Sequence, residues 1–337
     1  EEPDRTPFWE KLIKSPLADQ LLGRPCAAEN FTYRMERLAD GDWQGLTLQA
    51  ARDLVDLGKL LGFDLIRLYP NPLPPEERPV RLAANHWRVG DIHYEQLSTG
   101  WIRQWRPGAE PVAEEDRERA LRAALSQPPP LPAAWDDRCF LMMREARRLM
   151  AEEGLDWPIF AAAYTMGVAT QPPFFLRWFV TDRALVAEYY ARQRDAGLHY
   201  AHRLVDEGAD IIGLGGDLAC DHGPLCSPAD YRELIAENIA VQSQALRARG
   251  VWTTNASDGN LWSVLDAFLR VAGVDGFEEV DFAAGMDMAR LKRAYPDKTI
   301  IGNVDIRHCL TSGTPSQVRA HVRACLAAGW GNGGHIL

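Results

Sequence analysis

The sequence predicts an α/β fold, a single (β/α)8 TIM barrel that spans residues 1–337, and three observations support this prediction. Eight short strand-like segments can be counted, and most are followed by a helical stretch, which implies parallel strand–helix–strand units. Eight such units suggest a closed barrel, whereas fewer would suggest an open sheet. The length of 337 residues is normal for one barrel with insertions, and 46% hydrophobic residues suffice for a sizeable core.

The predicted strands are short apolar runs at residues 30–35, 63–69, 158–164, 210–214, 251–254, 276–280, 299–304 and 334–337. Several segments between them show helical periodicity instead. Within residues 228–249, the side chains of Ile235, Ile239, Gln242 and Leu246 recur at the spacing of one helix face. Strands and helices therefore alternate along most of the chain.

Two stretches do not fit a bare barrel. Residues 1–25 are interpreted as a helical N-terminal extension. Residues 72–135 contain a proline-rich start, a predicted hairpin over 87–106, an acidic helix and a second proline-rich run. We interpret 72–135 as an insertion after the second strand that covers one side of the barrel mouth.

The composition excludes some classes of function. A formal net charge of −10 disfavours a nucleic-acid partner, which needs a basic face to meet phosphates. The longest apolar run, 159–175, is interrupted by polar residues and prolines and is too short to cross a bilayer. We therefore expect a soluble protein with no membrane partner.

The six cysteines are scattered without CxxC spacing, which is typical of reduced thiols in a cytoplasmic protein. The first residues are charged and show no apolar stretch of the kind found in a signal peptide. These two features predict a cytoplasmic location.

Barrel enzymes place their chemistry in the loops at the carboxyl ends of the strands, so the residues at these ends are the candidates for a site. They combine carboxylates, amides, tyrosines and one histidine. The set comprises Tyr69, Asn71, Tyr164, Asp217, His222, Asn255, Asp258, Glu278, Glu279, Asn303 and Asp305.

From about Leu204 onward the sequence resembles the uroporphyrinogen decarboxylase superfamily. The resemblance rests on the order and spacing of stretches such as EGADIIGLGGDLACDHGPLCSPADY, NASDGNLW and the segment ending in GNVD. It is strong over residues 155–337, moderate over 55–106 and weak before that. The superfamily holds the decarboxylase of haem biosynthesis and the corrinoid-dependent methyltransferases, so the resemblance also implies the barrel fold.

In the methyltransferase branch, the region after the fifth strand carries His-x-Cys, two ligands of a zinc ion. The matching positions here are Ala256 and Asp258, and an alanine cannot coordinate a metal. We therefore expect no metal in this place. Asp258 is predicted to act as a general acid or base, or to polarise the substrate, with a helix cap or turn as the structural alternative.

Asp217 and Glu279 are the other two predicted catalytic residues. Asp217 ends a glycine-rich loop that lacks phosphate-binding spacing, and the resemblance implies that its side chain enters the pocket. Strand alternation sends Glu278 and Glu279 to opposite faces, and Glu279 is chosen as the inward one. Each residue has a structural alternative, namely hydrogen bonding to the backbone or solvation.

The remaining residues are predicted to bind substrate: Arg34, Tyr69, Asn71, Tyr164, His222, Asn255, Asn303 and Asp305. His222, Asn303 and Asp305 could equally be structural hydrogen-bonding residues. The decarboxylase branch has an arginine-rich motif where this chain has Arg34 and Arg37, and an aspartate where this chain has Asn71. Both departures count against decarboxylation of a polycarboxylate.

Three hypotheses follow, in descending order. The first is a corrinoid-dependent methyltransferase that demethylates a small methylated substrate, such as a methoxy-aromatic compound, and passes the methyl group to cobalamin on a partner corrinoid protein. The second is a decarboxylase (carboxy-lyase) of uroporphyrinogen or a related polycarboxylate. The third is a non-catalytic barrel that binds a tetrapyrrole or corrinoid, because one fold hosts many chemistries.

We expect no tightly bound cofactor, and a zinc ion is doubtful. A homodimer is left open. The sequence ends at the eighth predicted strand, whereas relatives continue with a loop and a final helix. We therefore expect either that the chain is truncated there or that further residues follow.

Overall fold

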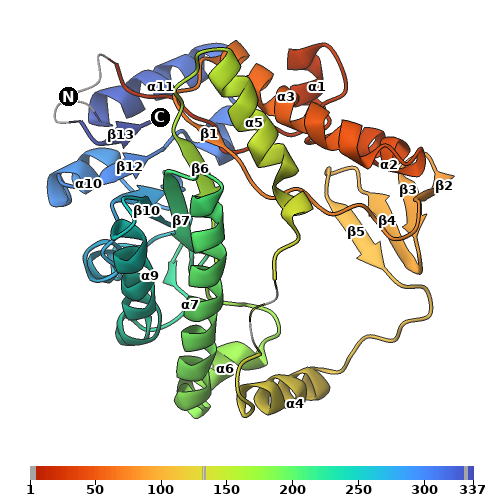
Figure 1. Ribbon diagram of the computed structural model, residues 1–337. Coiled ribbons are helices and arrows are strands. Elements are labelled where there is room, and N and C mark those ends of the chain that lie inside the picture. Colours follow the sequence, from red (N-terminus) through yellow and green to blue (C-terminus); the bar gives the residue numbers. More distant parts are fainter. Residues whose placement is uncertain (1–4, 131, 133, 330–332) are drawn as a thin grey trace. The chain divides into compact units, whose positions relative to one another are not determined.

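The computed structural model describes residues 5–130, 132, 134–329 and 333–337. The chain divides into two compact units, each built from several stretches (Figure 1). The sheet unit comprises Glu1–Trp9, Ala113–Pro132 and Phe160–Leu337, and the meander unit comprises Glu10–Val112 and Ala133–Ile159. The predicted insertion 72–135 is therefore shared between the two units. Among the described residues, no helix has both the length and the apolar character required to cross a membrane.

The sheet unit is built on parallel strands, which form a curled half-barrel of the TIM type. Their order is β6-β7-β10-β11-β12-β13, and every pair of neighbouring strands in this order is parallel. The bounds are Ile159–Ala162 (β6), Ile211–Gly215 (β7), Trp252–Ala256 (β10), Gly276–Glu278 (β11), Thr299–Ile301 (β12) and His335–Ile336 (β13). All six lie within predicted strand segments or overlap them, so this part of the prediction is confirmed.

Helices connect these strands, as parallel pairing requires. They are α6 (Phe174–Thr181), α7 (Arg183–Asp206), α8 (Pro228–Asp230), η2 (Tyr231–Ala236), α9 (Glu237–Arg247), η3 (Ala267–Val271), α10 (Met288–Ala294), η4 (Ile306–Leu310) and α11 (Pro315–Gly329), while α4 (Glu114–Leu125) precedes β6. Helix α7 packs against α9, and α9 packs against β10 (Figure 1). The core between the helices and the sheet is apolar, and Ile212, Leu214, Phe277 and Ile300 are fully buried there.

The N-terminal segment lengthens the sheet beyond β13. The Trp9 amide donates to the Leu337 carbonyl at 3.0 Å, and the Leu337 amide donates to the Pro7 carbonyl at 2.9 Å. Leu337 thus bonds two residues, Pro7 and Trp9, that lie two positions apart on the other segment, which is the hydrogen-bond pattern of a parallel pair. The Trp9 ring also lies 4.9 Å from the Phe160 ring on β6. Part of the extension predicted as helical is therefore extended chain that belongs to the sheet.

The meander unit begins with helices. They are α1 (Leu17–Leu22), α2 (Phe31–Ala39) and α3 (Trp43–Leu61), and α3 packs against α5 (Leu141–Glu152), which follows the short helix η1 (Asp137–Phe140). The prediction of a first strand at 30–35 is wrong, because α2 occupies those residues. Asn30 caps this helix, since its side-chain oxygen accepts the Tyr33 amide at 3.0 Å.

The predicted hairpin region is a four-stranded antiparallel meander. Its strands are β2 (Val80–Ala83), β3 (His86–Val89), β4 (Ile92–Gln96) and β5 (Ile102–Trp105), each paired with the next. The second predicted barrel strand is present as β1 (Ile66–Arg67), which lies beside β6 in the sheet order. The Ile66 amide donates to the Pro158 carbonyl at 3.0 Å.

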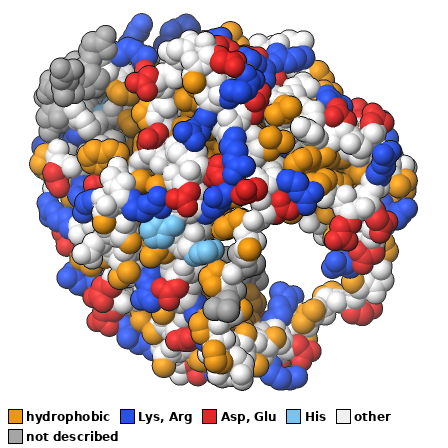
Figure 2. All heavy atoms as spheres, viewed as in Figure 1, with side chains coloured by type: hydrophobic (Ala, Val, Ile, Leu, Met, Phe, Trp, Pro, Cys, Tyr) orange, Lys and Arg blue, Asp and Glu red, His pale blue; other side chains and the backbone are white. Residues whose placement is uncertain are grey.

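The surface carries many ion pairs. Acidic and basic side chains are interspersed over the visible face (Figure 2). Arg148, for example, contacts Glu145 and Glu152, and Arg183 contacts Asp230 and Glu233. Exposed pairs of this kind contribute little stability each, so the fold depends on the apolar core.

Candidate functional site

An acidic cluster at the carboxyl ends of the strands

Three loops of the sheet unit bring carboxylates together where β7, β10 and β11 end. Asp217 follows β7, Asp258 follows β10, and Glu279 and Asp281 follow β11. Asp258 interacts electrostatically with each of the other three. The predicted catalytic residues Asp217, Asp258 and Glu279 therefore gather at one place, and all three are exposed to solvent.

The environment of Asp258 favours its protonated form. Partial desolvation of its carboxyl raises the pKa of Asp258, and the neighbouring charges of Asp217, Glu279 and Asp281 raise it further. Arg307 acts in the opposite direction. A carboxyl group with a raised pKa that remains open to solvent is suited to general acid catalysis.

Glu279 has an unusual backbone conformation. Its φ is +66°, in the left-handed region that residues other than glycine rarely adopt. Strand β11 has already ended at Glu278, so the alternation assumed from the sequence does not continue into Glu279. Residues held in this region concentrate at functional sites.

Arginine and backbone contacts that hold the loops

Arg307, in helix η4, binds two of the loops. Its guanidinium donates to both carboxylate oxygens of Asp221 at 2.7 Å and to Asp281 at 2.7 Å. These contacts hold the pKa of Asp221 below its usual range. Arg307 was not among the predicted site residues, and its one signal in the sequence is its place two residues beyond the Asn-x-Asp stretch.

The loop that carries Asp258 is held on both sides by backbone contacts. The Ser257 hydroxyl accepts the Leu218 amide at 3.1 Å, and the Asn260 amide donates to the Cys220 carbonyl at 2.9 Å. Gly259 has a φ of +84°, and a Cβ there would lie 2.9 Å from the backbone of the β7 loop. Only glycine therefore lets these two loops approach so closely.

The polar interior beneath the cluster

The inward glutamate is Glu278, and the choice of Glu279 from the sequence is wrong on this point. Glu278 is buried, and its carboxylate accepts the Tyr164 hydroxyl at 2.8 Å and the Thr254 hydroxyl at 2.6 Å. A Cβ on Gly213 would lie 2.7 Å from both Phe160 and Tyr164. Side chains from β6, β10 and β11 thus meet over Gly213 of β7 on the inner face of the sheet, and Tyr164 belongs to this group.

Other predicted residues

Three predicted binding residues have structural partners. Asn255 donates to the Phe268 carbonyl at 3.0 Å and to the Tyr231 hydroxyl at 3.3 Å, so its side chain faces the helices. Asn303 donates to the Met286 carbonyl at 2.8 Å. Asp305 caps η4 by accepting the His308 amide at 3.1 Å.

His222 lies next to Asp221 in the turn between the short strands β8 (Ala219–Cys220) and β9 (Gly223–Pro224), and it is exposed.

Arg34, Tyr69 and Asn71 belong to the meander unit. Asn71 is buried and bridges two backbone groups, since it accepts the Met142 amide at 2.9 Å and donates to the Arg138 carbonyl at 3.0 Å. Tyr69 is enclosed, and burial raises the pKa of its hydroxyl to about 12. Arg34 donates to the Ala28 carbonyl at 3.4 Å. These contacts give Asn71 a structural role.

Metal ligands and pockets

The positions that match the zinc ligands of the methyltransferase branch do not fit zinc. Ala256 has no donor atom, and the Ser257 hydroxyl already donates to the Asp258 carbonyl at 2.8 Å. Over the described ranges of the chain, no three His, Cys, Asp or Glu side chains form a group that could hold a metal ion.

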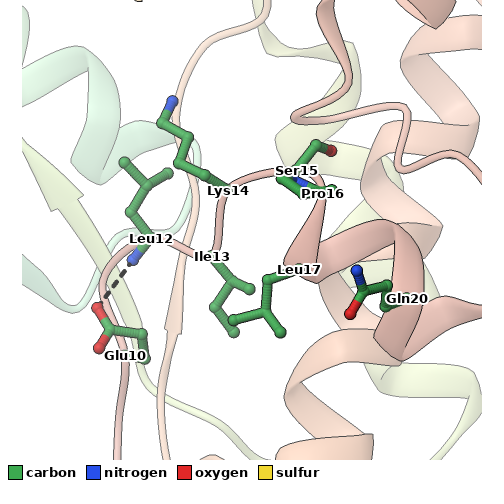
Figure 3. Close-up of a pocket in the computed structure, with 8 residues that line it drawn as sticks. All are labelled: Glu10, Leu12, Ile13, Lys14, Ser15, Pro16, Leu17 and Gln20. Atoms are coloured by element: carbon green, nitrogen blue, oxygen red, sulfur yellow. Dashed lines mark hydrogen bonds between the residues drawn. The ribbon is translucent and has the colours of Figure 1, made fainter. Parts of the chain in front are cut away.

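A separate pocket of about 460 Å³ lies near the start of the meander unit (Figure 3). Its lining includes the apolar side chains of Leu12, Ile13 and Leu17, and the Leu12 amide donates to the Glu10 carboxylate at 3.3 Å. The polar groups do not converge on a single point there. The acidic cluster is thus the better candidate for chemistry.

Similarity to known proteins

Two relatives are methyltransferases. Methylcobamide:CoM methyltransferase MtaA of Methanosarcina barkeri is 21% identical over 178 residues, which are 52% of this chain and 49% of that protein. The match thus spans about half the length of this relative. A solved structure of a methyltransferase from Methanosarcina mazei has a TM-score of 0.56 at 18% identity and covers 97% of this chain and 93% of that one. This second likeness bears on the fold alone.

The family-level match coincides with the part of the chain that carries the acidic cluster. It begins before β6 and includes every loop described above. The model of the uroporphyrinogen decarboxylase (URO-D) family matches residues 155–337, more than half of the chain, and the chain belongs to that family.

Proposed function

We propose that this chain is a corrinoid-dependent methyltransferase that demethylates a small neutral substrate of the aryl methyl ether type. The observation that carries the proposal is the raised pKa of Asp258 within a solvent-open cluster of carboxylates at the strand ends. Family membership and a relative that is a methylcobamide-dependent methyltransferase support it. The proposed reaction needs a proton donor beside the substrate, and Asp258 can supply one.

The proposed reaction moves one methyl group and one proton. The bond between the ether oxygen and the methyl carbon breaks, and the methyl group passes to an external two-electron nucleophile. The bonding electron pair stays on the oxygen, which takes a proton from Asp258 and leaves as the phenol. Asp258 then regains a proton from water. The charges of Asp217 and Glu279 raise the pKa of Asp258 by repulsion.

A corrinoid on a partner protein would supply the nucleophile. The rim beside the cluster is compatible with a docked acceptor, because Phe282 is 47% exposed and Ile306 is 69% exposed next to Asp281 and Arg307. Apolar surface rimmed by charge is common where partners bind. The proposed reaction does not use zinc, because Ala256 and Asp258, which match the zinc ligands of the methyltransferase branch, do not fit that metal.

Decarboxylation of a polycarboxylate suits the cluster less well. A substrate with several carboxylates would meet the negative charges of Asp217, Glu279 and Asp281. The arginine beside them, Arg307, is already bound to Asp221 and Asp281. A neutral substrate avoids this repulsion.

The proposal is tested with purified protein, chemically reduced cobalamin and a panel of methoxybenzenes. Methyl transfer is followed by the absorbance of methylcobalamin and by mass spectrometry of the released phenol. Transfer should be lost in Asp258→Asn and kept in Glu115→Gln, an exposed carboxylate on α4. A parallel incubation with uroporphyrinogen measures CO₂ release. CO₂ release without methyl transfer would establish a decarboxylase, and binding without turnover would favour a carrier.

A further inference from the structure

Arg307 is placed where the loops of the acidic cluster meet. Helix η4 begins directly after the strand-end residue Asp305, so Arg307 projects from the segment that follows β12. Its guanidinium is bidentate toward Asp221, with two contacts of 2.7 Å, and a third contact of 2.7 Å reaches Asp281. One side chain therefore joins the loops after β7, β11 and β12.

We propose that Arg307 is a positioning residue, which fastens the strand-end loops around Asp258 and places its positive charge beside that carboxyl. This role rests on the proposed function, in which Asp258 is the proton donor. Arginine suits the task because its planar fork can bind two carboxylates at once, which a lysine ammonium does less well.

The contact reaches Asp258 through Asp281. The Asp281 carboxylate accepts the Gly259 amide at 3.3 Å and the Ala284 amide at 3.2 Å, in addition to Arg307. Gly259 is the residue directly after Asp258. Arg307 thus orients Asp281, and Asp281 restrains the backbone that carries Asp258.

The charges that face Asp258 come from three elements. Asp217 belongs to the loop after β7, Glu279 and Asp281 belong to the loop after β11, and Arg307 follows β12. The carboxylates raise the pKa of Asp258 and Arg307 lowers it. Loss of the arginine charge should therefore move the titration of Asp258 to higher pH.

The test compares Arg307→Gln, which removes the charge, with Arg307→Lys, which keeps the charge and loses the fork. Arg247→Gln is the matched control, because Arg247 also bridges a loop, at Gly273 (2.6 Å) and Asp275 (2.9 Å), ahead of β11 and away from the cluster. Two properties are measured on the full chain. They are the ¹³C-carboxyl titration of Asp258, assigned with Asp258→Asn, and the hydrogen exchange of the Gly259 and Ala284 amides.

Arg307→Gln should shift the Asp258 midpoint upward and speed amide exchange at Gly259 by about tenfold or more. Arg307→Lys should keep the midpoint near that of the unsubstituted protein but still speed the exchange. Arg247→Gln should leave both properties unchanged. If Arg307→Gln does not fold, the Arg307→Lys result alone decides, because unchanged exchange in that variant overturns the fastening role.

An unchanged midpoint in a folded Arg307→Gln would overturn the electrostatic role. The Asp258 titration and the amide exchange do not depend on turnover, so both remain valid if no methyl transfer is found. A failure of the proposed function can therefore be told apart from a failure of this inference. Where turnover is measurable, the limb of the pH–rate profile that reports Asp258 should shift upward in Arg307→Gln. A purely structural role would lower the rate without moving that limb.

Discussion

Tyr164 donates its hydroxyl hydrogen to the buried carboxylate of Glu278 at 2.8 Å, which links the end of β6 to the end of β11 on the inner face of the sheet. The second carboxylate oxygen accepts the Thr254 hydroxyl from β10 at 2.6 Å. A buried carboxylate needs such donors because burial without partners is costly. The inner face beneath the acidic cluster is therefore polar and ordered.

Gly213 leaves the space that this arrangement requires. An added Cβ would lie 2.7 Å from Phe160 and Tyr164 and 3.0 Å from Glu278. Gly213→Ala should lower the free energy of unfolding by about 1–3 kcal/mol, the usual cost of overpacking a core. Urea unfolding measures the change. The cost should shrink in a Phe160→Leu background, because one of the two colliding rings is then gone, and equal costs in both backgrounds would contradict the account.

The raised pKa of Asp258 also predicts a pH-dependent stability. The folded state holds the proton more tightly than the unfolded chain, so this carboxyl favours folding below its ordinary pKa and disfavours it once pH exceeds the raised value. Asp258→Asn cannot ionise. Its melting temperature should exceed that of the unsubstituted protein by about 1–2 °C at pH 7.5, with the gain shrinking toward pH 4.5.

Thermal unfolding across this pH range checks the stability prediction, with Glu115→Gln as the control. A gain for Asp258→Asn that is constant with pH would show that the effect does not come from ionisation. A loss of stability at pH 7.5 would contradict the direction of the shift.

The cysteines should differ widely in reactivity. Cys220 on β8 is exposed, whereas burial raises the pKa of the Cys26 and Cys226 thiols to about 12. The thiolate is the reactive form, so iodoacetamide at pH 8 should modify Cys220 first and Cys26 and Cys226 last. Peptide mass spectrometry over time measures the order. Early modification of Cys226 would contradict the burial of its thiol.

Much of the fold could be predicted because its signals are local. The strand segments from 158–164 onward are short apolar runs bounded by glycine or polar residues, and each one became a strand. Residues 30–35 misled because Phe31, Thr32 and Tyr33 favour strands, while the capping oxygen of Asn30 and tertiary packing favour the helix. The pairing of Pro7–Trp9 with Leu337 joins the two chain ends, and no local pattern predicts it.

The site was predicted in part for the same reason. Asp217 and Asp258 follow strands, so their gathering follows from the parallel topology. The role of Arg307 depends on Asp221 and Asp281, which lie 86 and 26 residues away in sequence. Glu279 was chosen instead of Glu278 because strand alternation alone does not tell which of the two faces inward; in the structure β11 ends at Glu278, and Glu279 has a φ of +66°.

The most direct test of the central claim, that Asp258 protonates the leaving oxygen, is its dependence on the leaving group. Methyl transfer to reduced cobalamin is measured for methoxybenzene and for 4-nitromethoxybenzene, whose phenolate leaves readily without a proton. Asp258→Asn should slow the first reaction by about 10²–10⁴-fold and the second far less. An equal loss of rate for both methyl ethers, or no loss for either one, would contradict a proton-donating role for Asp258.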